Sequence, residues 1–193
     1  MPQPERELYE WSETVSRKLP SLSAPQAGVL ALYSFGMVLV QGCGLTSIAV
    51  FLGMVLGRKA NSVRQQLREL TYDGADKRGA KRQTLEVESC FGDLLGWVLS
   101  WWDSDEQRLA LAIDATNFKD IFTVLTVSVV YRGCAIPVAW RVLGATTKGA
   151  WQPHWEYLLE TLQPSIPADW VVIVLADRGL YAKWLYKRIV KLG

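Results

Sequence analysis

The sequence is poor in the side chains that most often build metal and redox centres. Its 193 residues include one histidine, His154, and three cysteines, Cys43, Cys90 and Cys134. A single histidine without a second ligand beside it does not predict a zinc site. The cysteines form no C-x-x-C pair, and their odd number favours free thiols in a reducing compartment.

Several functional signatures are also missing. There is no Gly-rich phosphate loop of the G-x-x-x-x-G-K-[ST] type, and Asp114-Ala115-Thr116 lacks the second aspartate of a phosphohydrolase Asp-x-Asp-x-Thr loop. The first residues lack the basic start and apolar stretch of a signal peptide. These absences remove the commonest nucleotide-binding and secretory interpretations.

Charge is absent from residues 27–57, so a simple hydropathy plot would suggest a membrane span. The stretch contains six glycines, however, and Gln41-Gly42-Cys43-Gly44 divides it into two pieces of about a dozen residues each, too short to cross a bilayer. We therefore expect two buried helices over 27–40 and 45–56 and no membrane partner. Solubility without detergent would dispose of the membrane alternative.

The net charge is only +2, but residues 58–82 carry eight basic side chains and three acidic ones. The pattern predicts a helix over 45–56, a short turn with Asn61 as N-cap, and a polar helix over 62–70, which is the plan of a helix-turn-helix. The alternative is an ordinary solvated face. Arginine and glutamine side chains on such a helix are the types that contact phosphates and base edges. The candidate DNA-binding residues are Arg58, Lys59, Arg64, Gln65, Arg68, Lys81 and Arg82.

The second half of the chain has runs rich in β-branched residues, typical of strands. The patterns predict strands at 109–114, 121–131, 135–143 and 171–176. A helix over 154–162 separates the last two, which indicates a crossover, so the fourth strand is expected to lie beside the first and parallel to it. Further helices are predicted at 5–19, 86–102 and 182–192.

Two of these strands end in an aspartate, Asp114 and Asp177. Ligands of open α/β sheets bind at the carboxyl ends of the strands, and paired carboxylates suit Mg²⁺. Two such ions can stabilise the attacking and leaving oxygens of a phosphoryl transfer. The simpler interpretation is a turn or cap residue after each strand. Asn117 and Lys119 are expected either to flank the site or to be loop residues, and Arg178 either to contact DNA phosphate or to pair with an acid.

The residues around both aspartates resemble a known family. Leu-Ala-Ile-Asp114-Ala-Thr, the hairpin that follows and Val-Leu-Ala-Asp177-Arg-Gly-Leu are similar to the first two acidic motifs of DDE transposases of bacterial insertion sequences. The resemblance spans about residues 25–193. It implies a ribonuclease H-like catalytic domain that cleaves and transfers strands at transposon ends, using two Mg²⁺ (or Mn²⁺) ions held by Asp, Asp and Glu. Asp114 and Asp177 match the two aspartates.

The sequence departs from the family pattern at the third carboxylate, for which it has no counterpart. In the family the Glu lies well downstream of the second Asp, on a helix with a Tyr, Arg, Glu and Lys signature, whereas this sequence ends at Gly193. No residue here can be assigned to it. The sequence is therefore expected to be the front part of a transposase, from a truncated copy or an interrupted reading frame, and to be inactive alone.

Taken together, the sequence predicts an α/β protein with three parts. Residues 1–25 form a polar segment, residues 26–75 a helical, helix-turn-helix-like DNA-binding segment, and residues 76–193 a partial ribonuclease H-like mixed sheet with flanking helices. The expected partner is double-stranded DNA in the cytoplasm, in association with the nucleoid, and a homodimer stays open. One alternative is an inactive DNA-binding regulator. Another is a two-aspartate, Mg²⁺-binding signalling domain, which the hairpin over 121–143 argues against.

Overall fold

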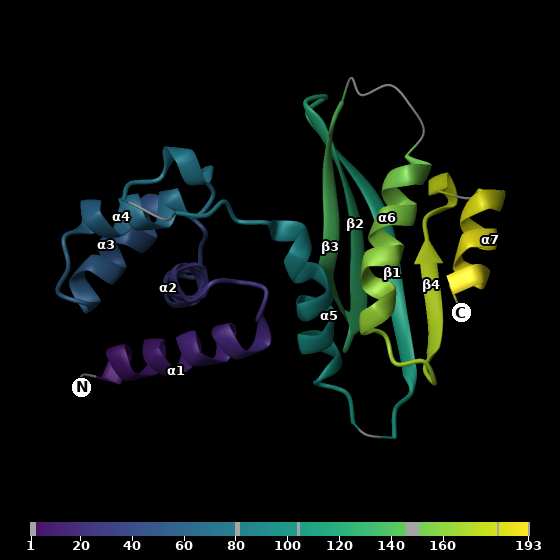
Figure 1. Cartoon of the computed structure of the whole chain (residues 1–193), viewed down its shortest axis with the longest axis horizontal. Coiled ribbons are helices and arrows are strands. Elements are labelled where there is room, and N and C mark those ends of the chain that lie inside the picture. Colours follow the sequence, from purple (N-terminus) through teal and green to yellow (C-terminus); the bar gives the residue numbers. More distant parts are fainter. Residues whose placement is uncertain (1–2, 80–81, 104, 146–150, 181, 193) are drawn as a thin grey trace. The chain divides into compact units, whose positions relative to one another are not determined.

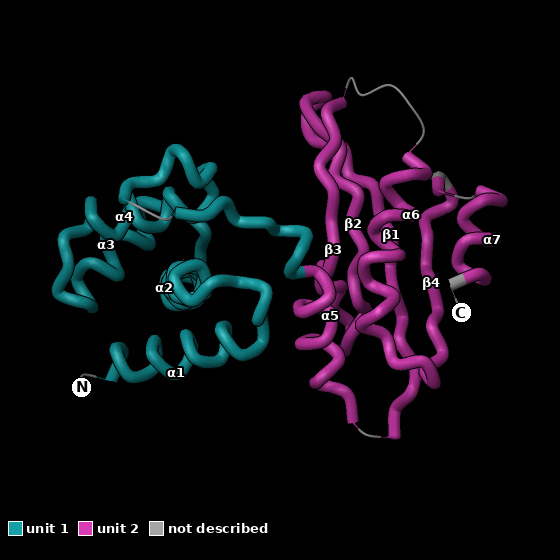
Figure 2. The backbone as a smooth tube through the Cα atoms, viewed as in Figure 1, with its two compact units in different colours: residues 1–90 teal, residues 91–193 magenta. Residues whose placement is uncertain are grey.

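The computed structural model describes residues 3–79, 82–103, 105–145, 151–180 and 182–192. The chain divides into two compact units, unit 1 with residues 1–90 and unit 2 with residues 91–193 (Figure 2). The α/β class predicted from the sequence is confirmed, with one four-stranded mixed sheet and surrounding helices. The functional division at residues 25 and 75 stays a prediction.

Unit 1 is helical. Its elements include the helices α1 (Gln3–Lys18), α2 (Ala24–Val40), α3 (Leu45–Val55) and α4 (Ala60–Glu69) and the short 3₁₀ turns η1 (Gly74–Asp76) and η2 (Val87–Cys90) (Figure 1). The start of α2 is fixed by Ser23, whose backbone N–H donates to the Gln26 side chain at 2.9 Å, as in a capping box. The four helices predicted for this region are confirmed to within three residues at either end.

The charge-free stretch supplies much of the core of unit 1. Leu32 of α2 and Ile48 and Leu52 of α3 pack with Val63 and Leu67 of α4, and each of these side chains is buried. The described residues contain no single helix that is long and apolar enough to cross a membrane. Only α2 and α3 taken together have the length and composition for it, and they are bent by 96° at their junction.

Glycine allows the close approach of α3 and α4. A Cβ atom on Gly53 would lie 2.9 Å from the Arg58 carbonyl oxygen and 3.1 Å from the Ala60 Cα atom, and Gly57 has a φ of +60° in the connecting turn. The predicted N-cap is wrong: the cap of α4 is Lys59, and Asn61 lies inside the helix. The Lys59 carbonyl oxygen accepts the first hydrogen bonds of α4, which the backbone N–H groups of Ser62 and Val63 donate.

Unit 2 contains a four-stranded sheet in the order β3-β2-β1-β4 (Figure 1). Its strands are β1 (Arg108–Phe118), β2 (Phe122–Tyr131), β3 (Cys134–Gly144) and β4 (Val171–Ala176). The β1–β2 and β2–β3 pairs are antiparallel, and β1 pairs with β4 in parallel. The predicted meander and the parallel neighbours β1 and β4 are therefore confirmed.

The first hairpin differs from the prediction, because β1 continues beyond Asp114 to Phe118. The polar residues Thr116 and Asn117 pair with β2 through their backbone, so a polar run did not end the strand. Lys119 and Asp120 make the turn with φ values of 47° and 51°, the conformation of a type I′ hairpin turn. The predicted turn at Arg132 and Gly133 is confirmed.

Helices pack on one face of the sheet. They are α5 (Phe91–Leu99), α6 (Gln152–Leu162) and α7 (Lys183–Leu192), and they form a core with Leu109, Leu111 and Ile113 of β1. The helix expected over 86–102 is shorter, since the 3₁₀ turn η2 replaces its start. The opposite face of the sheet, called here the open face, exposes Ile173 and Leu175 of β4 by about half of their surface.

The close packing at Gly53 generates a prediction about stability. Gly53→Ala would force a methyl group against backbone atoms that cannot rotate away, so unfolding should become easier by about 1–3 kcal/mol, as for other overpacked sites. Gly96→Ala in α5 is the matched control, because a Cβ atom there meets nothing within 4 Å and alanine favours helix by about 1 kcal/mol. Urea unfolding followed by circular dichroism measures both, and equal midpoints for the two variants would contradict this packing.

Candidate functional site

Asp114 lies on the open face of the sheet, near the carboxyl end of β1. Its neighbours in the strand, Ile113 and Ala115, turn to the helix-covered face by the alternation of side chains along a strand, and Ile113 is buried while Asp114 is exposed. The Thr116 hydroxyl donates a hydrogen bond to Asp114 Oδ2 at 2.6 Å. This bond orients the carboxylate and leaves Oδ1 without a hydrogen-bond partner from the described residues.

Asp177 directly follows Ala176, the last residue of the neighbouring strand β4. The parallel register pairs Ile113 with Ala176, so the two aspartates each follow the last aligned residues. Adjacent strands are about 4.8 Å apart. Asp114 belongs to the alternating set of β1 that includes Ala112, whereas Asp177 lies just beyond β4. The register therefore brings the backbones of two exposed aspartates to the same end of the sheet.

These two carboxylates are suitable ligands for a hard divalent cation. Carboxylate oxygens with water and phosphate oxygens are what Mg²⁺ prefers, and a cation between two like charges removes their repulsion. Among the described residues, no group of three or more His, Cys, Asp or Glu side chains is placed to hold a metal ion. Asp114 and Asp177 are therefore candidate metal ligands only as a pair.

The sequence analysis named other residues for the neighbourhood of the site. Asn117 accepts a hydrogen bond from Thr123 across the β1–β2 pair at 2.6 Å, and Lys119 lies in the hairpin turn with its ammonium over the Phe118 ring. Both belong to the hairpin beyond Asp114. Arg178 directly follows Asp177, is exposed, and makes no ion pair with the described acidic residues.

The one histidine lies away from the two aspartates in the sequence and has a partner of its own. His154 of α6 is half-buried, with Nδ1 at 3.3 Å from the Arg141 guanidinium, which also stacks over Tyr157. His154 therefore packs beside a guanidinium group on the surface of α6.

The helix-turn-helix predicted for DNA binding is partly as expected. In α4, Val63 and Leu67 face the core, and Arg64 and Arg68 are exposed. Gln65 differs from the expectation of an outward side chain: it is half-buried and donates a hydrogen bond to Glu69 at 2.9 Å. Of the three candidate side chains on α4, the two arginines are therefore the exposed ones.

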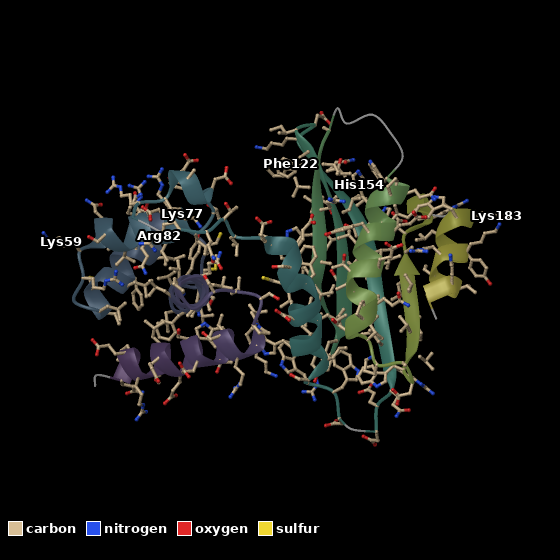
Figure 3. All side chains as sticks on the ribbon, viewed as in Figure 1. Lys59, Lys77, Arg82, Phe122, His154 and Lys183 are labelled. Carbon is tan, nitrogen blue, oxygen red and sulfur yellow. The ribbon has the colours of Figure 1, made fainter. Side chains whose placement is uncertain are left out.

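The other candidate DNA contacts lie before and after α4. Lys59 is exposed, and Arg58 is exposed and donates to Gln66 at 2.7 Å. Arg82 is exposed and donates to the Arg78 carbonyl at 2.8 Å. Lys81 lies outside the described residues. Figure 3 shows Lys59 and Arg82 in unit 1.

Sequence reasoning missed one contributor to the candidate site. Thr116 was not singled out, although a hydroxyl two residues after an aspartate in a strand lies on the same face and can bond to it.

Comparison with protein-family models, with curated proteins and with solved structures finds no match for this chain. Any assignment of function therefore rests on the residues themselves and on their geometry.

Proposed function

We propose that this chain is a DNA-binding protein of the DDE transposase type, in which Asp114 and Asp177 hold divalent metal for strand cleavage and transfer at transposon ends. The observation that supports the proposal is the register of β1 against β4, which brings the backbones of two exposed aspartates to the same end of the sheet. A ribonuclease H-like identity of the sheet is part of the proposal. Its support is the strand order β3-β2-β1-β4, with an antiparallel meander followed by a helical crossover.

In this proposal the carboxylates bind and orient rather than transfer protons. Asp114 is held by the Thr116 hydroxyl through Oδ2, which directs Oδ1 toward a cation shared with Asp177. The bound metal would stabilise the charge on the attacking and leaving oxygens of a phosphodiester. Arg178, exposed beside Asp177, would neutralise a neighbouring phosphate.

Unit 1 would supply sequence-independent affinity for DNA. Exposed Arg64 and Arg68 lie one turn apart on α4, on a different side of the helix from the buried Val63 and Leu67. Cations at this spacing can contact successive phosphates, and each neutralised phosphate releases condensed counterions. The association is therefore expected to depend strongly on salt.

The first prediction from the proposed function concerns metal. Calorimetric titration with Mn²⁺ should show weak binding that falls by more than about tenfold in Asp114→Asn and in Asp177→Asn, since losing a ligand should cost at least as much as losing an outer-shell partner. Asp120→Asn is the matched control. It removes an exposed carboxylate from the hairpin turn, where a φ of 51° is tolerated by asparagine. If Mn²⁺ binds equally well to all three variants, Asp114 and Asp177 are not the metal ligands.

The second prediction concerns DNA. Replacing Arg64 and Arg68 with alanine should weaken binding of duplex DNA and reduce the slope of log affinity against log salt by up to about two units, because two phosphate contacts are lost. Arg6→Ala with Arg17→Ala is the control, removing the same charge from the acid-bearing helix α1. An unchanged slope in the α4 variant, measured by fluorescence anisotropy, would place the DNA contact elsewhere.

A second candidate function is a DNA-binding regulator that occupies transposon ends without cutting them. The observation that favours it is the lack of a third carboxylate beside Asp114 and Asp177 among the described residues. Losing charge stabilisation of one oxygen in a transition state commonly costs a hundredfold to a thousandfold, roughly, in rate. Nicking of end-bearing DNA in Mn²⁺ separates the two: nicking that Asp177→Ala abolishes supports the enzyme, and tight binding without nicking supports the regulator.

A further inference from the structure

Helix α7 carries an unusual concentration of positive charge. Its sequence, KWLYKRIVKL, contains four basic residues and no acidic one. Lys183, Lys187 and Lys191 follow each other at intervals of four residues and are exposed. These three side chains, called here the lysine stripe, therefore lie along one side of the helix, and Lys183 points away from the ribbon in Figure 3.

Arg188, the fourth basic residue of α7, has an acidic partner within unit 2. Arg188 is 80 % covered and forms an ion pair with Glu160 of α6, whereas the lysine stripe forms no ion pair with described residues. Leu185 is buried, and Ile189 packs against the same core. The helix is thus anchored through its apolar side and its one paired arginine, and it presents the unpaired lysines to solvent.

The spacing of the lysine stripe suits a nucleic-acid backbone. Eight residues of helix span about 12 Å, and one DNA strand carries a charge about every 3.4 Å along the axis, so the stripe faces about three phosphates. Tyr186 is 70 % exposed beside the stripe, and a tyrosine hydroxyl is a common donor to phosphate.

A membrane surface is the main competing partner for a basic amphipathic helix. Binding in a lipid interface requires the apolar face of the helix to enter the acyl boundary. In α7 that face is occupied, because Leu185 is 5 % exposed and belongs to the core of unit 2. Among the described side chains of α7, the exposed large hydrophobics are Val190 and Tyr186, which favours a soluble polyanion over lipid.

We infer that the lysine stripe of α7 is a second DNA contact surface, which holds the phosphate backbone close to Asp177. Lys183 lies only six residues after Asp177, beyond the short turn η4 (Arg178–Leu180). DNA bound along α7 would therefore lead to the carboxyl end of β4. This inference rests on the proposed function, since it assumes that DNA is the substrate at Asp114 and Asp177.

The test uses the full chain and a short mixed-sequence DNA duplex. The variant Lys183→Gln, Lys187→Gln, Lys191→Gln should lower the salt slope of binding by up to about 2.7 units, at about 0.9 per phosphate. Its control is Arg6→Gln, Arg17→Gln, Lys18→Gln, which removes three charges from α1 and should leave the slope nearly unchanged. A benzophenone amino acid in place of Tyr186 should crosslink to the duplex, while the same group in place of Tyr9, 59 % exposed on α1, should not.

The outcomes separate this inference from the proposed function. If the unchanged chain binds DNA and loses affinity in the Arg64 and Arg68 variant, but the α7 variant keeps its slope and Tyr186 does not crosslink, the inference is overturned and the proposed function stands. Loss of binding to phosphatidylserine vesicles, with DNA binding unchanged, would identify α7 as a membrane contact and would also overturn it. No DNA binding by the unchanged chain overturns both.

Discussion

The parallel pairing of β1 with β4 is the constraint on which the candidate site depends. Hydrogen bonds between Arg108–Ile113 and Val171–Ala176 fix the register, and a shift by one residue would move one aspartate to the opposite face of the sheet. Such a pair requires a crossover, which α6 supplies while burying Trp155 and Leu158 against the sheet. Apolar packing on the helix-covered face therefore helps to fix the backbone positions of the two aspartates.

The same pairing leaves one face of the sheet uncovered. Along β4, Val172 and Val174 pack toward the helices, whereas Ile173 and Leu175 are half exposed beside the small residues Ala110 and Ala112 of β1. Small side chains next to Asp114 leave the carboxylates accessible to a large substrate. In the proposed function, accessibility of this kind suits a polymer such as DNA better than a small ligand, which is usually enclosed in a pocket.

Much of this arrangement could be predicted from the sequence, because runs of Val, Ile and Leu with a two-residue alternation mark strands. The order of elements was sufficient to predict that β1 and β4 are parallel neighbours. The continuation of β1 through Thr116 and Asn117 was not predicted, since a pattern of side-chain polarity does not report backbone pairing. The hydrogen bond between Thr116 and Asp114 depends on this continuation of the strand, so it was not predicted either.

Side-chain partners were the least predictable feature. Gln65 resembled an outward polar residue of a recognition helix, yet it bonds to Glu69, and helical spacing alone cannot tell a solvated glutamine from one with an intrahelical partner. In α7, Arg188 and the three lysines look equivalent in sequence. They differ in the fold because only Arg188 meets an acid, Glu160 of α6.

The central claim is that Asp114 and Asp177 together hold a divalent cation, and cleavage of the chain by bound iron tests it most directly. Fe²⁺ with ascorbate generates radicals that cut the backbone next to the metal. The account predicts fragments that end near Asp114, near Asp177 and near Thr126, the residue of β2 that pairs with Asp114. Excess Mg²⁺ should suppress these fragments. Fragments that end elsewhere, or cutting that persists in Asp114→Asn and Asp177→Asn, would contradict the claim.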